Sequence, residues 1–402
     1  MDRVAEVAAN AHWSGGPRAG RRRPGAWSVS AVALVTLASS LLVLGAATAA
    51  SAATCTSWNY TTIPNVGSDS NYLAGVDATS TCDAWAVGFY SNGTYQQTLT
   101  EHWDGTSWSI VASPEGTAQG SWLNAVRELS PTDVWAVGYD TDSAGFHTLI
   151  EHWNGSAWSV VPSPDEGTGG LLYAVRGTSP TNLWAVGDYG FGTQERSLIE
   201  HWNGSTWTIT PSPNPGAESN LLQSVAATSS TNAWAVGDYW GSTARTLIEH
   251  WNGSTWKVVP SPNEGGGENY LHGVRVFSAT NAWAVGSFAK GGVSRTLVEH
   301  WNGTTWSIKT SPDQGANDND LVALAPVATT SIWAVGYTTG QGQPERTLIE
   351  HWNGTSWTVK HSGNEGQDTS LNAVAATSST NVWAVGSYYD GSAERTFVEH
   401  CC

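Results

Sequence analysis

The sequence is poor in charge and in basic residues. Asp, Glu, Lys and Arg make up 13% of its 402 residues, and 17 Lys and Arg stand against 34 Asp and Glu, a formal net charge of −17. Nucleic acids and anionic membrane surfaces select for basic proteins, so this charge argues against both as partners. The four cysteines show no C-x-x-C or Cys/His spacing of a zinc site.

Long apolar runs are missing after the first 53 residues. There, Arg18 and Arg21–Arg23 precede an apolar run from Val32 to Leu44, and small residues follow up to Ala53. This order is typical of a secretory signal peptide, and the run is shorter than the ~20 residues of a membrane span. We therefore predict a signal peptide over residues 1–53 and secretion of residues 54–402 without a membrane span. The leader carries a net charge of +3, which leaves −20 on the mature chain.

Tryptophan is abundant, with 24 residues that mostly belong to a repeat. Trp-Ala-Val-Gly occurs seven times at spacings of 49 or 50 residues, beginning at Trp85, Trp135, Trp184, Trp234, Trp283, Trp333 and Trp383. Glu-His follows each copy 15 to 17 residues later, and six copies continue as Glu-His-Trp with a further Trp five residues on. The repeat covers essentially the whole mature chain, so it defines a single domain over residues 54–402.

Each repeat predicts four short strands, as in residues 371–376, 383–388, 346–352 and 355–359. The last two are joined by Asn353-Gly354, a dipeptide that favours tight hairpin turns. No segment of the mature chain has helical periodicity. Four strands per 50 residues without helices predict an all-β, seven-bladed β-propeller with four antiparallel strands per blade. We interpret the repeated tryptophans as packing between blades rather than as a ligand site.

The two ends of the mature chain resemble halves of one blade. Residues from Cys55 resemble a fourth strand, and the chain ends at Glu399-His400-Cys401-Cys402, a third strand without its fourth. We therefore predict that the N-terminal strand completes the seventh blade and closes the ring. Because exported proteins favour disulfides, we expect Cys55 to bond Cys401 or Cys402, and the remaining one to bond Cys82.

The repeat resembles that of kelch-type propellers. Trp-Ala-Val-Gly stands where that repeat has an apolar strand ending in paired glycines, and Glu-His-Trp-Asn-Gly-x-x-Trp where it has a tyrosine and a spaced tryptophan. The glycines here are single, and Trp replaces the tyrosine. The Asn-Gly-x-x-Trp turn is also similar to a shortened Asp-box of sialidase-type propellers. The resemblance implies the architecture over residues 57–402 and no function, because propellers host many functions.

The repeated Glu-His pair invites a catalytic interpretation. Neighbouring residues on a strand face opposite sides, so the two side chains cannot share one site. Seven copies favour hydrogen bonding within or between blades, with candidate partners Arg196, Arg245, Arg295, Arg346 and Arg395. We find no catalytic residue, because no single blade shows a nucleophile, arginine cluster or metal set, and we expect the isolated His272 and His361 at the surface.

Variation between the repeats concentrates in the loops between second and third strands and in the links between blades, which share one face of a propeller. Variable loops suggest a binding face, although neutral drift accounts for them equally well. Its aromatic candidates for ligand contact are Trp122, Phe146, Phe191, Trp240, Tyr270, Phe288 and Tyr389. Aromatic residues beside acids and amides suit carbohydrate, and clustered carboxylates could hold Ca²⁺.

We therefore expect a monomeric, secreted, non-enzymatic binding propeller whose partner is an extracellular polysaccharide or a surface protein. The alternatives are a carbohydrate-active enzyme, a lyase or glycosidase using carboxylates of the loop face, and a structural surface protein. A central channel with broken symmetry would favour the enzyme, and a uniform channel would favour binding.

Overall fold

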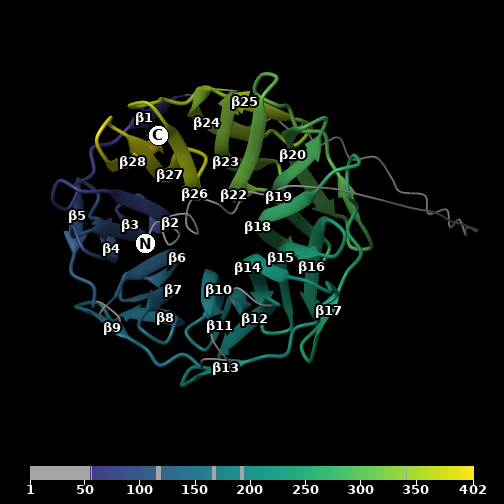
Figure 1. The fold of residues 1–402 in the computed structure, drawn as a ribbon, viewed down its shortest axis with the longest axis horizontal. Coiled ribbons are helices and arrows are strands. Elements are labelled where there is room, and N and C mark those ends of the chain that lie inside the picture. The colour runs from purple at the N-terminus through teal and green to yellow at the C-terminus, as the bar shows by residue number, and fades with distance from the viewer. Residues whose placement is uncertain (1–54, 56, 115–118, 165–168, 191–193, 341) are drawn as a thin grey trace, which may run out of the picture.

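The chain folds into seven four-stranded antiparallel sheets arranged as blades around a central channel (Figure 1). The computed structural model describes residues 55, 57–114, 119–164, 169–190, 194–340 and 342–402, so the predicted signal peptide lies outside the described residues. The predicted all-β propeller with seven blades is confirmed. No helix in the described part of the chain has the length and apolar character needed to cross a bilayer.

The strands follow the repeat. Blade 1 consists of β2 (Asn71–Ser80), β3 (Asp83–Ser91), β4 (Gln96–Trp103) and β5 (Trp108–Val111). Blade 2 consists of β6 (Ser121–Ser130), β7 (Asp133–Thr141), β8 (Phe146–Trp153) and β9 (Trp158–Val160). Blade 3 consists of β10 (Leu171–Ser179), β11 (Asn182–Tyr189), β12 (Arg196–Trp202) and β13 (Trp207–Ile209). Blades 4 and 5 consist of β14 (Asn220–Ser229), β15 (Asn232–Trp240), β16 (Ala244–Trp251) and β17 (Trp256–Val258); and β18 (Asn269–Ser278), β19 (Asn281–Lys290), β20 (Val293–Trp301) and β21 (Trp306–Ile308). Blade 6 consists of β22 (Asp318–Ala328), β23 (Ser331–Gly340), β24 (Gln343–Trp352) and β25 (Trp357–Lys360), and blade 7 of β26 (Thr369–Ser378), β27 (Asn381–Tyr389), β28 (Glu394–Cys401) and β1 (Trp58–Tyr60).

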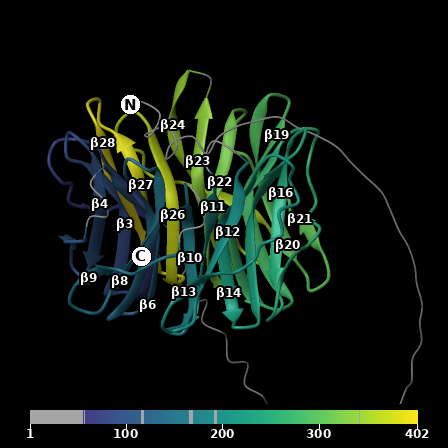
Figure 2. The same ribbon diagram turned by 60° about the horizontal axis from the view of Figure 1, so that its bottom comes forward.

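The first strand of each blade lines the channel, and the fourth strand forms the outer edge (Figure 1). The loops between second and third strands lie beside the links between blades, since the Ser91 N–H donates to Ser70 O over 2.7 Å. We call this side the loop face. The turns between first and second strands and between third and fourth strands form the opposite side, the turn face, where Trp103 Nε1 donates to Thr81 O. Figure 2 shows the strands running between the two faces.

The glycine of each Trp-Ala-Val-Gly permits a close approach between the first two strands. The register between them shifts at the same place in every blade, as between Leu73 and Gly75 in blade 1. A Cβ on Gly88 would lie 1.9 Å from Tyr72 O, and the other six glycines of the repeat meet the same obstacle at 1.8–2.1 Å. The invariance of this glycine within the repeat therefore follows from backbone contact at a β-bulge.

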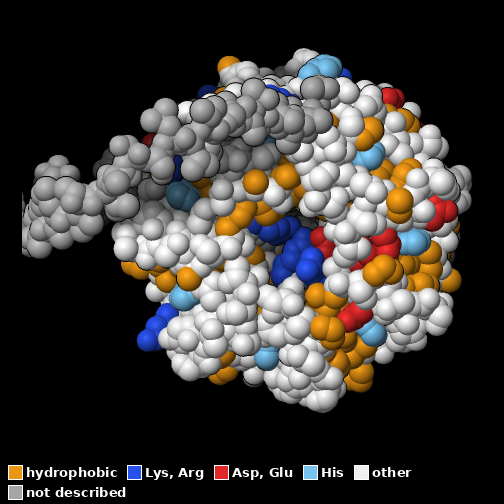
Figure 3. Space-filling model, turned by 180° about the vertical axis from the view of Figure 1, so that it is seen from behind, with side chains coloured by type: hydrophobic (Ala, Val, Ile, Leu, Met, Phe, Trp, Pro, Cys, Tyr) orange, Lys and Arg blue, Asp and Glu red, His pale blue; other side chains and the backbone are white. Residues whose placement is uncertain are grey.

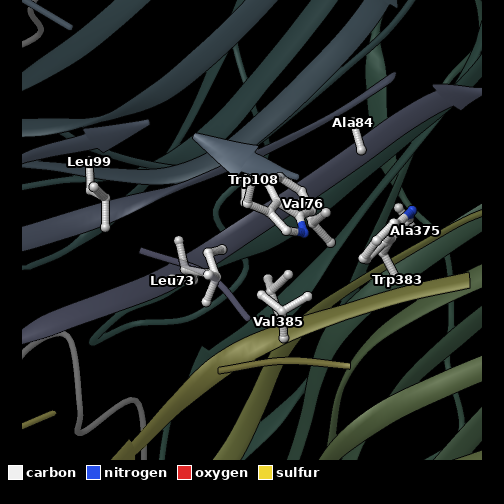
Figure 4. Close-up of a cluster of buried hydrophobic side chains, with 11 residues drawn as sticks. Leu73, Val76, Ala84, Leu99, Trp108, Ala375, Trp383 and Val385 are labelled. Atoms are coloured by element: carbon white, nitrogen blue, oxygen red, sulfur yellow. The ribbon is translucent and has the colours of Figure 1, made fainter. Parts of the chain in front are cut away.

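Tryptophan packs each blade against the next, as expected. Trp383 of blade 7 lies 5.0 Å from Trp103 and 5.3 Å from Trp108 of blade 1, measured between ring centroids. Figure 4 shows this junction, where side chains of both blades meet in one buried cluster. Equivalent tryptophan contacts occur at the other junctions.

The N-terminal strand closes the ring as predicted. It pairs antiparallel with β28, with Trp58 opposite Cys401 and Tyr60 opposite Glu399. The Cys55–Cys401 disulfide fastens the same two segments, with the Cα atoms 5.5 Å apart. Trp58 also packs edge-to-face on Trp333 of blade 6 at 5.3 Å. The seam therefore reproduces the contacts of an ordinary blade, with Cys401 in place of the third-strand tryptophan.

The second predicted bridge is absent. Cys82 and Cys402 are both exposed free thiols in this structure. Cys82 belongs to the turn between β2 and β3 of blade 1, where Thr81 and Gly105 surround it. Cys402 follows β28 in blade 7, so the two thiols belong to different blades. The expectation of four bridged cysteines is therefore wrong for this pair.

Candidate functional site

The channel breaks the sevenfold symmetry of the repeat. The residue of the first strand that pairs with each second-strand tryptophan occupies one level around the channel. This ring consists of Asp77, Arg127, Arg176, Ala226, Arg275, Ala325 and Ala375. The interpretation that no blade carries an arginine cluster is therefore wrong. The signal was present in the sequence, because these residues stand eight positions before each Trp-Ala-Val-Gly.

The charged members of the ring meet across the channel. Arg127 Nη1 lies 2.9 Å and Arg176 Nη1 3.6 Å from Asp77 Oδ2. The second contact joins blades 3 and 1, which are not neighbours, so it can form only across the opening. Arg176 also donates to Val126 O, and the backbone N–H of Glu128 donates to Asp77. Seen from behind the view of Figure 1, basic side chains fill the central opening, with acidic side chains beside them (Figure 3).

Guanidinium groups outnumber carboxylates in this cluster. Burial favours the neutral form of Asp77, but Arg176, Arg127 and the Glu128 N–H outweigh it and lower the pKa of the carboxyl. Burial and the neighbouring guanidinium groups lower the pKa of Arg275 well below its usual value. Burial also raises the pKa of Glu128 to about 8, so that side chain is largely uncharged at neutral pH. Arg127 and Arg176 therefore contact the Asp77 carboxylate, while Arg275 donates to Val274 O and acts on Asp77 only electrostatically.

Polar and aromatic residues continue along the first strands toward the loop face. His272 lies on β18, three residues before Arg275, and its ring is nearly parallel to that of Tyr270 at 6.3 Å. His272 Nε2 is 3.9 Å from Asp320 Oδ1, and its side chain is only 14% exposed. The expectation of a surface position for His272 is therefore wrong.

The loop-face end of the channel is acidic. Asp188 and Asp238 directly follow the Trp-Ala-Val-Gly of their blades, and both are buried. Burial raises the pKa of Asp188 to about 8 and that of Asp238 to about 7. Tyr173 hydrogen bonds to the first of these carboxyls. Within the described residues, no three His, Cys, Asp or Glu side chains are arranged to hold a metal ion, so the expected calcium site has no such group there.

The structure separates the aromatic residues predicted to form the binding face. Trp122 is 2% exposed and stacks on Tyr139 at 4.8 Å, so its expected role as an exposed ligand contact is wrong. Phe146 packs edge-to-face on Tyr139 at 5.7 Å in the same cluster. The rings of Trp240 and Tyr270 lie 6.5 Å apart and are both half-buried.

The remaining aromatic candidates stand apart. Phe288 packs against the core between blades 4 and 5. Tyr389 is half-buried at the end of β27. Phe191 lies outside the described residues. Of the six candidates that the structure describes, only Trp240 and Tyr270 therefore lie together as a half-buried pair.

The Glu-His repeat is structural in its contacts, as predicted, although its partners are not the suggested arginines. Each glutamate is buried, and six accept hydrogen bonds from a serine of the preceding blade, as Glu249 does from Ser212. Each histidine bonds a residue at the start of the second strand of its own blade, as His250 does with Asn232 at 2.8 Å. The same ring packs at a tilt of 34° against the second-strand tryptophan, Trp234, with the ring centroids 4.3 Å apart.

Comparisons with known proteins show the fold. Neither a protein-family model nor a curated protein matches the sequence. Among solved structures, YCF48 bound to D1 peptide has a TM-score of 0.55 at 12% identity and covers 86% of this chain and 97% of its own. YCF48 from Cyanidioschyzon merolae has a TM-score of 0.52 at 14% identity, covering 85% and 98%. An ulvan lyase of polysaccharide lyase family PL25, bound to -[GlcA(1-4)Rha3S]-, has a TM-score of 0.50 at 10% identity, covering 80% and 90%.

Proposed function

We propose that the chain is a secreted binding propeller whose central channel holds the carboxylate groups of an acidic extracellular polysaccharide. The observation that carries this proposal is the ring of Arg127, Arg176 and Arg275 around the single carboxylate of Asp77. Guanidinium groups bind carboxylates through paired, charge-assisted hydrogen bonds. Burial and mutual repulsion make it costly to hold these guanidinium groups together, and a bound anion would offset that cost.

The chemistry of the channel supports a sugar polymer rather than a small ion. Beyond the arginines, the first strands carry Asn124, Tyr173, His272 and Asn372 at their register shifts. Asn124 and Asn372 already donate to the Leu172 and Leu73 carbonyls, so these strands offer a sugar chiefly the rings of Tyr173 and His272. Sugars are bound in proteins by such polar and aromatic combinations. The fold neighbours bound to a peptide and to a glucuronate-containing polysaccharide give examples of propellers holding extended ligands. Export through the predicted signal peptide belongs to the same proposal.

Binding to matched polysaccharides tests the proposal. Residues 54–402 should bind polygalacturonate, lose this binding at high salt, and bind carboxyl-reduced polygalacturonate at least ~10-fold less tightly. Arg176→Gln and Arg275→Gln should each lower the affinity by a similar factor. Arg295→Gln, which removes an arginine outside the channel, is the control and should bind normally. Equal binding of the native and carboxyl-reduced polymers would overturn the proposal.

A second candidate function follows from the broken symmetry of the channel, which favours an enzyme. Arg275, His272 and Tyr270 lie on one strand, so a uronate bound at the arginine would place a base beside the sugar. In a lyase reaction the base removes the proton at C5, the C4–O bond breaks, a C4–C5 double bond forms, and the leaving oxygen gains a proton. Ultraviolet absorbance of the unsaturated product tests this candidate. No absorbance from a folded protein that binds polygalacturonate would exclude the lyase for this substrate and leave binding.

A further inference from the structure

A polar pocket of about 220 Å³ opens on the loop face of blade 6. Its walls come from the link that enters the blade and from the facing ends of β23 and β24. The lining residues are Gln314, Asn317, Thr338, Thr339, Gly340, Gln343, Pro344 and Arg346. The pocket is smaller than the ~300–1,000 Å³ of a drug-sized site, so it suits a single sugar unit.

Arg346 is the charged residue of this pocket. Within the described residues its guanidinium group has no hydrogen bond or ion pair, although the side chain is half-buried. The equivalent Arg295 of blade 5 donates to Asp313 at 3.2 Å, and Arg395 of blade 7 donates to Asp390 at 2.7 Å. The repeat therefore normally supplies an acceptor to this arginine.

Within the described residues, Arg346 lacks both kinds of acceptor that its neighbours have, the Asp313 carboxylate of blade 5 and the Asp390 carboxylate of blade 7. In blade 5, Asp313 Oδ1 accepts the backbone N–H of Thr296, and its second oxygen faces Arg295. In blade 6, Asn364 accepts the backbone N–H of Thr347 in the same way at 3.0 Å. The amide keeps the backbone contact but supplies no negative charge. The guanidinium group of Arg346 is thus left available to an external anion.

We propose that this pocket binds an anionic sugar unit, with its carboxylate or sulfate on Arg346 and its hydroxyl groups on the surrounding amides and threonines. Gln314, Asn317 and Gln343 offer both donors and acceptors, as sugar hydroxyls require. Pro344 adds an apolar surface beside them. The nearby carboxylate of Asp318 is occupied, since the Ser294 N–H and the Thr339 hydroxyl donate to it. The site stands apart from the channel and does not depend on the function proposed there.

Calorimetric titration of residues 54–402 with three probes tests the pocket, using methyl glucuronide, glucose 6-sulfate and methyl glucoside. The two anionic sugars should bind more tightly than the neutral one, and the stronger of the two identifies the anion. Arg346→Gln should weaken binding of the anionic sugars about 10- to 100-fold and leave the neutral sugar unchanged. Asn364→Asp restores the acceptor found in blade 5, so it should weaken the same binding while Arg346 is intact.

The channel variant Arg275→Gln is the control that separates the two sites. It should leave binding of the anionic monosaccharides unchanged, whatever its effect on polygalacturonate. Equal affinities in the wild type, Arg346→Gln and Asn364→Asp would overturn the pocket proposal and leave the channel proposal untouched. Loss of monosaccharide binding in Arg275→Gln alone would place the anion in the channel and also overturn the pocket.

Discussion

The hydroxyl of Ser261 in blade 4 lies 3.0 and 2.9 Å from the two carboxyl oxygens of Glu299 in blade 5. The glutamate is fully buried, and burial raises the pKa of its carboxyl to about 8 although the serine contact opposes the rise. Glu299 therefore works as a neutral carboxylic acid that ties blade 4 to blade 5, and five other repeat glutamates accept the same serine contact. This explains why the Glu-His pair recurs seven times without forming a catalytic dyad.

Removing the serine of one junction should destabilise the ring. Ser261→Ala leaves the Glu299 carboxyl without its donor, and an unsatisfied buried polar group costs about 1–3 kcal/mol. Glu299→Gln keeps an acceptor for Ser261 and the neutral charge, so it should cost less. Urea unfolding of both variants at neutral pH measures the free energies. A larger loss for the glutamine variant would contradict a neutral glutamate.

Replacing Glu101 with an apolar residue should have the opposite effect on stability to replacing the equivalent glutamate of another blade. Ile63 stands at the serine position of the seam, and among the described residues neither carboxyl oxygen of Glu101 has a hydrogen-bond partner. Burial raises the pKa of this carboxyl to about 9. Replacing a buried, unpartnered polar group with an apolar one is neutral or stabilising, whereas Glu299→Met orphans a serine. Thermal unfolding should therefore rank Glu101→Met at or above the wild type and Glu299→Met below it.

The buried glutamates also set how stability depends on pH. Burial raises the folded-state pKa of Glu151, Glu249 and Glu350 to about 8, above the unfolded value of 4.5. Their contribution is complete below the unfolded pKa and is lost as pH rises through the folded pKa. Burial lowers the pKa of five repeat histidines, His201, His250, His300, His351 and His400, and that of His351 falls to about 4. These five therefore reduce stability only as pH falls below about 6.5. Between pH 6.5 and 8 these five histidines contribute little, and the buried carboxyls set the slope.

The free energy of unfolding should therefore fall as pH rises from 6.5 to 8. Glu249→Gln removes one titrating group, so its curve should be flatter by up to about 1.4 kcal/mol per pH unit. Urea unfolding across this range measures both slopes. A free energy that rises with pH in the wild type would show that the glutamates are ionised in the folded protein.

The repeat made most of the fold predictable from sequence, and local contacts decided the rest. The spacing of Trp-Ala-Val-Gly sets the blades, and the incomplete blade at each end predicts the closure between Trp58 and Cys401. The arginine ring was not predicted, because the bulge before Gly75 interrupts the alternation of inward- and outward-facing residues along the first strand. That alternation alone therefore does not tell which residues face the channel. The burial of Trp122 was not predicted, because the sequence alone does not distinguish a strand tryptophan that stacks on Tyr139 from an exposed aromatic residue in a loop.

Asp77 should limit the anion affinity of the channel. Asp77→Asn removes the carboxylate that Arg127 and Arg176 contact, so the three guanidinium groups face one another without a counter-ion. We expect lower stability without ligand and tighter binding of polygalacturonate, with the ligand restoring stability by mass action. Urea unfolding with and without the polymer measures both effects. Loss of binding in a folded Asp77→Asn protein would show that the arginines do not form the anion site.

The disulfide at the seam should stabilise the fold, whereas the two free thiols should contribute little to stability. Cys55 and Cys401 join segments 346 residues apart, and β1 contributes only three paired residues to blade 7. Cys55→Ser should lower the free energy of unfolding by about 2–5 kcal/mol. Cys82→Ser and Cys402→Ser change exposed thiols and should stay within about 0.5 kcal/mol of the wild type. Limited proteolysis should release the N-terminal segment from Cys55→Ser first, and equal resistance of all three variants would show that strand pairing alone closes the ring.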